Sequence, residues 1–129
     1  MRVHVAYDPH RTPPAPILPI RLGRPGAEPN VLLVALVDTG ADATVIPPAL
    51  AMRLDLPILA EVAVAGTGGF SQRAMVHAAI VEVGGSQWPV QVLALGGEAL
   101  VGRDLLNQWV VTLRGPAQIL EVETPVPFS

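Results

Sequence analysis

The chain has 129 residues, of which 50% are hydrophobic, and a formal net charge of −3 from 8 basic and 11 acidic side chains. A chain of this length can bury one hydrophobic core but not two, so we expect a single domain over residues 1–129. The absence of cysteine excludes disulfide bonds, a thiolate nucleophile and a cysteine-ligated zinc ion. Without a cluster of basic residues there is little electrostatic attraction for nucleic acid, which we do not expect as a partner.

No segment of the sequence is suited to export or to a membrane. The apolar stretch Val31–Val37 is far shorter than the roughly 20 residues that cross a bilayer. The first residues, Met1–Val5, lack the apolar core of a secretory signal. We therefore expect a cytoplasmic protein without a membrane anchor.

Proline is concentrated at the beginning of the chain, where seven of the 14 prolines lie within residues 1–29. Proline lacks a backbone donor and disrupts helices, so residues 1–16 are predicted to form a proline-rich arm outside the core. Ile17–Leu22 follows as a candidate first strand. Because this strand contains Pro19, we expect it at the edge of a sheet rather than in its middle.

The run Val31–Val37 is apolar at every position and predicts a strand buried on both faces. Beyond it, β-branched segments alternate with glycine-rich turns, a pattern that indicates a mostly β domain. The predicted later strands are Glu61–Ala65, Met75–Val83, Trp88–Leu95, Val110–Leu113 and Gln118–Val122, the predicted short helices are Pro48–Leu54 and Arg103–Trp109, and residues 123–129 are predicted as a loose tail.

Asp38 comes directly after the apolar strand Val31–Val37 and is the most conspicuous candidate for chemistry. An ionised carboxylate at the end of such a strand is costly to desolvate, so it needs hydrogen bonds or a partner that shares its proton. Thr39 can brace the loop with its hydroxyl, and Gly40 lets backbone N–H groups approach the carboxylate closely. The alternative for this tripeptide on its own is an ordinary acidic turn between two strands.

Three segments follow one another in the chain: Asp38–Ala41 (Asp-Thr-Gly-Ala), Gly66–Phe70 (Gly-Thr-Gly-Gly-Phe) and Gly102–Leu106 (Gly-Arg-Asp-Leu-Leu). In this order they resemble the retropepsins, the single-lobed aspartic peptidases of retroviruses and retroelements and their cellular and bacterial relatives. The resemblance runs from about Ile17 to Val122. It implies an all-β, closed-barrel acid-protease fold with a glycine-tipped hairpin flap and one short helix near the C-terminus.

The resemblance implies that Asp38 is the catalytic residue of an aspartic endopeptidase. No other aspartate is followed by Thr-Gly or Ser-Gly, so the second carboxylate would come from another copy, in a homodimer with an Asp38/Asp38′ dyad. Two carboxylates about 3 Å apart do not both ionise readily, and the proton they share can serve acid–base chemistry on a polypeptide substrate. This chemistry requires no metal ion and no cofactor.

The resemblance also assigns supporting roles to residues around Asp38. Thr39 would tie the two active-site loops together across the twofold axis, and Gly40 would meet the substrate backbone. Arg103, which follows Gly102 at the start of the last helix, would fasten the loop through an ion pair with Asp42, although a solvated surface charge is the alternative. The other substrate-binding residues would be Ala41, Asp42, Gly66, Thr67 and Gly68, the last three of which also suit a plain hairpin turn.

Two questions about function stay open at this point. A fold does not by itself establish an activity, so a catalytically silent dimerisation or binding module is the alternative to the enzyme, which the intact Asp38–Gly40 favours. The start at Met1 without a neighbouring domain favours an independent cellular protein over a piece of a retroelement polyprotein. Viral relatives interleave their chain ends in the dimer, but two prolines after Glu123 would weaken such pairing here.

Overall fold

The computed structural model describes residues 1–125, with only the backbone described at Thr67. Its strands are β1 (Arg2–Ala6), β2 (Ile17–Gly23), β3 (Val31–Val37), β4 (Val45–Ile46), β5 (Ile58–Ala65), β6 (Ser71–Val83), β7 (Ser86–Ala94), β8 (Leu100–Val101), β9 (Val110–Arg114) and β10 (Ile119–Glu123). Its helices are α1 (Pro48–Arg53), α2 (Arg103–Leu106) and the short 3₁₀ turn η1 (Thr67–Gly69). Every strand predicted above is present, with shifts of up to four residues at the ends, and β1, β4 and β8 are further strands of the structure.

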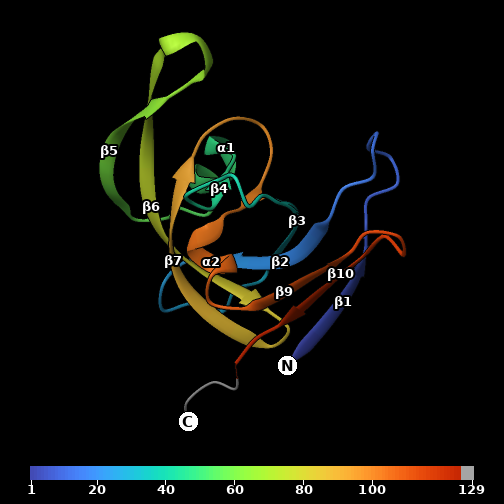
Figure 1. Ribbon diagram of the computed structural model, residues 1–129. Coiled ribbons are helices and arrows are strands. Elements are labelled where there is room, and N and C mark those ends of the chain that lie inside the picture. Colours follow the sequence, from blue (N-terminus) through green and yellow to red (C-terminus); the bar gives the residue numbers. More distant parts are fainter. Residues whose placement is uncertain (126–129) are drawn as a thin grey trace.

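Seven strands form one sheet in the order β2-β3-β8-β4-β7-β6-β5. An additional pairing of β2 with β6, which joins Arg21 to Glu82 and Gly23 to Ile80, closes six of these strands into a barrel. Among the described residues β5 pairs only with β6, so the β5–β6 hairpin projects from the barrel, as Figure 1 shows. The all-β fold with a closed barrel is therefore confirmed.

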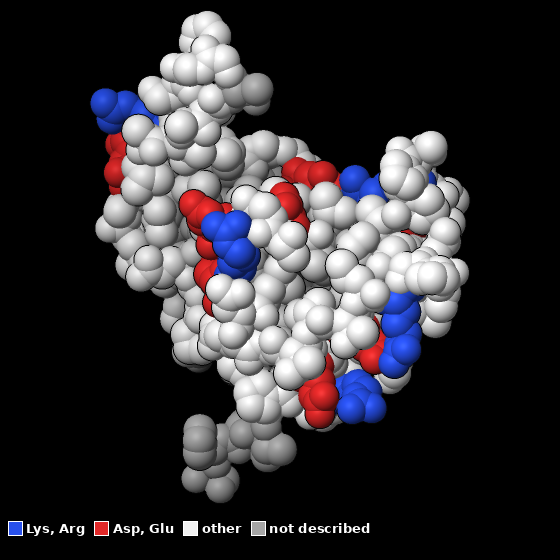
Figure 2. Space-filling model, viewed as in Figure 1, with Lys and Arg blue, Asp and Glu red and all other residues white. Residues whose placement is uncertain are grey.

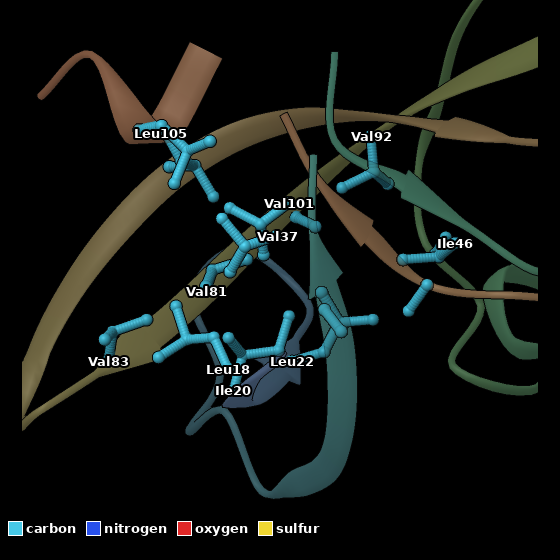
Figure 3. Packing of buried hydrophobic residues seen from close by; sticks show 14 of the residues in the cluster. Leu18, Ile20, Leu22, Val37, Ile46, Val81, Val83, Val92, Val101 and Leu105 are labelled. Carbon is cyan, nitrogen blue, oxygen red and sulfur yellow. The ribbon is translucent and has the colours of Figure 1, made fainter. Parts of the chain in front are cut away.

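Alternate side chains of the strands fill the barrel, because successive residues of a strand point to opposite faces. Val37 and Val101, which directly precede Asp38 and Gly102, are both buried in this core. The two strands that lead to the candidate site are thus anchored by packing. Figure 3 shows how core side chains from β2, β3, β4, β6, β7, β8 and α2 meet; those labelled are Leu18, Ile20, Leu22, Val37, Ile46, Val81, Val83, Val92, Val101 and Leu105.

The prediction that Val31–Val37 is buried on both faces is wrong for the first half of this strand. Leu32 and Val34 are 60% and 53% exposed, whereas Ala35 and Val37 are buried. The reason is that Leu32 and Val34 lie on the face of β3 opposite to that of Ala35 and Val37, and here only the face of Ala35 and Val37 packs on the core. A run of apolar residues does not say where along a strand its second face is covered.

The two chain ends form a separate three-stranded sheet in the order β1-β10-β9. Arg2 pairs with Glu123 and Ala6 with Ile119, so the prediction of an arm is wrong for the part that forms β1. The predicted tail is likewise wrong at Glu123, which lies in β10, while residues 126–129 lie outside the described residues. Within residues 1–125 no helix has the length and apolar character that a membrane crossing requires.

Candidate active site

Asp38 stands at the end of β3, where the backbone is held from both sides. The N–H of Asp38 donates to the carbonyl oxygen of Val101 at 3.0 Å, on the β8 side. The N–H of Val37 donates to the carbonyl oxygen of Pro16 at 3.0 Å, just before β2. The strand end therefore reaches the surface at one defined place, between two neighbouring segments of the barrel.

The loop after β3 turns tightly around the Asp38 carboxylate. The N–H of Gly40 donates to Asp38 Oδ1 at 2.9 Å, and the N–H of Ala41 donates to the Asp38 carbonyl oxygen at 3.2 Å. A Cβ atom on Gly40 would lie 3.2 Å from the same Oδ1, so glycine makes this close approach easy. Asp38 is partly buried, whereas Thr39 and Gly40 are exposed. One side of the carboxylate is thus held by its own loop, and the tip of the loop is free for another molecule.

A polar pair, the buried Thr44 and the partly buried Asp104, fastens the far end of this loop. The hydroxyl of Thr44, which is 1% exposed, donates to Asp104 Oδ1 at 2.8 Å, and its N–H donates to Asp104 Oδ2 at 3.0 Å. The same hydroxyl accepts from the N–H of Gly102 at 3.3 Å, and Asp104 also accepts from Leu105 N–H at 2.9 Å. These bonds join the loop to the start of α2 and satisfy every polar atom of the Thr44 side chain.

The sequence does not predict the contact between Thr44 and Asp104, which we call the brace of the loop. Asp104 attracts attention only as a possible second catalytic aspartate, and it is excluded because Thr-Gly does not follow it. Thr44, between Ala43 and Val45, gives a weak signal, since a threonine that enters a strand is usually unremarkable. The pairing spans 60 positions, which no local pattern predicts.

Arg103 holds the near end of the loop. Its Nη1 donates to the Thr39 carbonyl oxygen at 2.8 Å, its Nη2 forms an ion pair with Asp42, and its backbone N–H donates to the Ala41 carbonyl oxygen at 2.9 Å. The expected contact between Arg103 and Asp42 is therefore present. Both side chains are largely exposed, at 44% and 88%, so the pair itself contributes little stability. Its place in the structure is to connect the tip of the loop to α2.

Gly102 directly follows β8 and lies against the backbone of the loop that follows Asp38. A Cβ atom at this position would lie 2.5 Å from the carbonyl oxygen of Ala43 and 3.0 Å from that of Ala41. Backbone atoms at such distances have no room to move aside, so only glycine fits. The structure thus gives a steric reason for a glycine that the sequence indicates only through resemblance.

The predicted flap residues form the tip of the β5–β6 hairpin. The N–H of Gly66 donates to the Phe70 carbonyl oxygen at 2.7 Å, and Gly68 and Gly69 both have φ of 81°. Within residues 1–125 no hydrogen bond joins this tip to the Asp38 loop. In Figure 2 the surface is hollowed between the hairpin and the loop that connects β1 with β2.

The predicted site residues fall into two groups in a single chain. Those that the structure brings together around the Asp38 loop are Asp38, Thr39, Gly40, Ala41, Asp42, Gly102 and Arg103. The hairpin residues, at the tip formed by η1, stand apart from that loop. A pocket of about 410 Å³ at the base of the hairpin contains none of the predicted residues; it is lined by Pro48, Met52, Ile58, Glu61, Arg73, Ala74, Met75, His77 and Ala94.

The described residues contain no cluster of three His, Cys, Asp or Glu side chains that could bind a metal ion. The group of this loop that can exchange a proton is the Asp38 carboxylate. Asp38 is held as an acceptor by one backbone donor, and it has an exposed loop tip beside it. Such a group can take or give a proton at a molecule placed on the tip.

Comparison with known families assigns the chain to one of them. A sequence model described as "gag-polyprotein putative aspartyl protease" matches residues 30–108, which include the Asp38 loop, the β5–β6 hairpin and α2. The chain belongs to this retropepsin-like family. A search of curated protein sequences gives no match.

Solved structures support the same fold. A retropepsin-like aspartic protease from Rickettsia conorii matches with a TM-score of 0.69 and 16% identity, over 96% of this chain and 91% of that one. The EIAV protease, solved in complex with an inhibitor, matches with a TM-score of 0.57 and 21% identity, over 80% of this chain and 92% of the viral one. At these identities the matches establish the fold of the chain.

Proposed function

We propose that this protein is an aspartic endopeptidase, active as a homodimer in which the Asp38 of each copy supplies one half of the site. The observation that carries the proposal is the Asp38 carboxylate, held at 2.9 Å by Gly40 N–H beside an exposed loop tip. One chain of 129 residues has one such loop. A carboxylate dyad then needs a second copy, and the whole chain acts as one domain that supplies half of an active site.

In the proposed reaction the two carboxylates share one proton. The ionised carboxylate takes a proton from a water molecule, whose oxygen attacks the carbonyl carbon of the scissile peptide bond, while the other carboxylate donates its proton to the carbonyl oxygen. The tetrahedral intermediate then breaks its C–N bond, and the amine leaves with a proton returned by the dyad. No covalent intermediate with the protein forms.

The surrounding residues have roles that follow from their contacts. Thr39 and Gly40 at the exposed tip would meet the partner loop and the substrate backbone. Arg103, together with Asp42, keeps this tip in place through its bond to the Thr39 carbonyl oxygen at 2.8 Å. Ala41 belongs to the same tight turn and would lie beside the bound peptide.

The β5–β6 hairpin would act as a flap that closes over a bound peptide. Its tip residues Gly66, Thr67 and Gly68 would then offer backbone N–H groups to the substrate. Gly68 and Gly69 at the tip have positive φ, a conformation that lets a hairpin reverse in a small space. The family assignment and the inhibitor-bound EIAV protease support this role.

The proposal is tested by incubating the purified protein with a denatured proteome between about pH 4 and 7, beside an Asp38→Asn variant. We expect new peptide termini from the wild type. In the variant we expect activity to fall by about 10²-fold to 10⁴-fold, because the Asn side chain cannot exchange the proton. Mass spectrometry of the fragments measures both.

The alternative function, a catalytically silent dimerisation or binding module, predicts a different outcome. Wild type and Asp38→Asn would then give the same fragments, and both would remain dimeric. Equal fragment patterns from the two proteins would refute the peptidase.

A further inference from the structure

The pocket at the base of the β5–β6 hairpin lies where the hairpin leaves the barrel. Among the described residues β7 pairs with β6 as far as Met75, which lies opposite Ala94, and both of these residues line the pocket. On the other side the lining includes Pro48 and Met52 of α1, and Figure 1 shows α1 beside the hairpin. The pocket thus spans the junction between the hairpin and the barrel.

The wall on the hairpin side continues the core face of β6. Ala79, Val81 and Val83 of this strand are buried in the barrel. Alternate residues of a strand share a face, so Met75 and His77 point to the same side as these three. Met75 lies beyond the core cluster and is 39% exposed. A side chain on the core face of β6 therefore lines a pocket that is open to solvent.

The apolar part of the lining can adapt its shape. Two of the three methionines of the chain, Met52 and Met75, line the pocket together with Ile58. Met52 and Ile58 are both exposed. A methionine side chain is flexible and polarisable, and its sulfur packs well against aromatic rings. The lining therefore favours an apolar group, above all an aromatic ring, as the body of a ligand.

His77 adds a hydrogen-bonding group to the wall of the pocket. The residue is 6% exposed, and its Nδ1 lies 3.0 Å from the carbonyl oxygen of Leu56. A carbonyl oxygen only accepts hydrogen bonds, so Nδ1 carries the proton and donates it. In the neutral ring the other nitrogen, Nε2, then has a lone pair that can accept a hydrogen bond.

This Nε2 atom is directed into the pocket. Within residues 1–125 the fully enclosed side-chain nitrogen atoms without a partner belong to Arg11, Trp88 and Trp109. Nε2 of His77 has no partner among the described residues and is not one of these enclosed atoms, so it is accessible. Since His77 lines the pocket, this access is from the pocket. An unpaired acceptor on a side chain that is more than nine-tenths buried favours a ligand that donates a hydrogen bond.

The charges at the pocket compensate each other. Glu61 and Arg73, which also line it, form an ion pair at 2.8 Å across the hairpin. Both side chains are exposed, at the outer part of the lining. Neither charge is therefore left to attract an ion, and the ligand that suits the pocket is uncharged.

We propose that this pocket is a binding site, apart from the Asp38 loop, for a small uncharged molecule with an aromatic body and one hydroxyl group. The ring would pack against Met52, Met75 and Ile58, and the hydroxyl would donate to His77 Nε2. The volume of about 410 Å³ is typical of small-molecule sites. A ligand there contacts α1 and the hairpin at once, so it holds the hairpin to the barrel. Such a site requires neither a second copy nor catalysis.

The methionine methyl groups report binding directly, with an internal control. The third methionine, Met1, bonds to Thr124 in the sheet of the chain ends. We expect an NMR titration of methyl-¹³C-methionine protein with benzyl alcohol to shift the Met52 and Met75 signals with one dissociation constant, of about 1 mM. The Met1 signal should stay in place. Unmoved Met52 and Met75 signals, or a Met1 signal that moves with them, would overturn the site.

The hydrogen bond to His77 is tested with a matched ligand. Benzyl methyl ether has the same ring as benzyl alcohol but no hydrogen-bond donor. We expect its dissociation constant to be about 5-fold higher or more, because Nε2 then stays without a donor. Equal dissociation constants for the two compounds would refute the role of His77 in the site.

A charge in the wall tests where the ligand binds. We expect Met75→Glu to raise the dissociation constant of benzyl alcohol at least about 10-fold, with the Met52 methyl signal as reporter and circular dichroism unchanged. Leu59→Glu is the control, because Leu59 is exposed on the same hairpin but does not line the pocket. If the two variants bind the alcohol equally well, the ligand does not occupy this pocket.

The effect on the hairpin is measured by hydrogen exchange of the β5 amides. When the hairpin separates from α1 the site is lost, so benzyl alcohol at about ten times its dissociation constant should slow this exchange by about 10-fold. Met75→Glu should show no such slowing at the same concentration. Unchanged exchange in the saturated wild type would overturn the coupling between the ligand and the hairpin.

This site and the peptidase fail in different ways. We expect Asp38→Asn to bind benzyl alcohol like the wild type, since the loop is not part of the pocket. A protein that binds the alcohol but cleaves no peptide would refute the peptidase alone. A peptidase that depends on Asp38 but does not bind the alcohol would refute this site alone.

Discussion

The loop that carries Asp38 and the β5–β6 hairpin are built in opposite ways. The loop is fastened at both ends, by Arg103 near Thr39 and by the bond between the buried Thr44 and Asp104. The hairpin projects from the barrel, and seven of the eight residues of β5 are exposed. Its tip is the single 3₁₀ turn η1, closed by a hydrogen bond from Gly66 N–H to the Phe70 carbonyl oxygen.

This difference has a physical meaning for the proposed catalysis. A carboxylate that transfers protons has to be held in position before the substrate arrives, since each ångström of displacement lowers the rate. A segment that closes over a substrate needs a low free energy of local opening, and exposed strands with few buried contacts have it. We therefore expect substitutions in the loop to affect global stability, and substitutions at the hairpin tip to affect only local opening.

The largest effect on stability is expected for Gly102→Ala. Its Cβ atom would lie 2.5 Å from the Ala43 carbonyl oxygen, so the loop has to move, at a cost of about 3 kcal/mol in the free energy of unfolding. Urea denaturation at a fixed protein concentration measures this. Gly97→Ala is the control, because nothing lies within 4 Å of its added Cβ. Equal unfolding midpoints for the two variants would contradict the tight contact.

A smaller but still large effect is expected for Thr44→Val. The substitution keeps the shape of the side chain but removes the hydroxyl between Asp104 and Gly102, so the buried N–H of Gly102 loses its acceptor and the partly buried Asp104 carboxylate loses one of its donors. We expect a loss of about 2 kcal/mol, measured by the same denaturation. Thr12→Val, at an exposed threonine, should change stability by less than about 0.5 kcal/mol. If the two substitutions cost the same, the brace is not what holds the loop.

The hairpin side of the comparison is tested by Gly69→Ala. Gly69 has φ of 81°, and alanine in this region costs about 1 kcal/mol although no atom obstructs it. Because the hairpin opens locally, we expect faster hydrogen exchange at the Gly66 amide and an unchanged global unfolding midpoint. Gly115→Ala, in the β9–β10 turn without positive φ, is the control. A lower global midpoint for Gly69→Ala would place the hairpin in the same cooperative unit as the loop.

The smallest effect on stability is expected for Arg103→Lys. Lysine cannot bond the Thr39 carbonyl oxygen and Asp42 at once. Since both side chains are exposed, we expect less than about 1 kcal/mol of lost stability but a several-fold lower kcat/KM, as the loop tip loosens. Arg73→Lys, in the exposed pair with Glu61 on the hairpin, is the control and should leave unfolding unchanged. Peptide cleavage at unchanged kcat/KM by Arg103→Lys would show that the loop needs no such clamp.

The sequence by itself determined the elements that depend on neighbouring residues. Local patterns predict the apolar run before Asp38, the glycines of the hairpin tip and the positions along the chain of the strands named in the sequence analysis. The structure has each of these. The contact of Arg103 with Asp42 followed from resemblance rather than from any pattern, and it is present too.

The tertiary structure alone decided which distant segments meet. The pairing of Arg2 in β1 with Glu123 in β10 joins residues 121 positions apart, the bond between Thr44 and Asp104 joins residues 60 apart, and the exposure of Leu32 depends on which face of β3 packs on the core. Periodicity along a chain reports how a residue relates to its neighbours, whereas these features depend on the closure of long loops and on packing around one shared core.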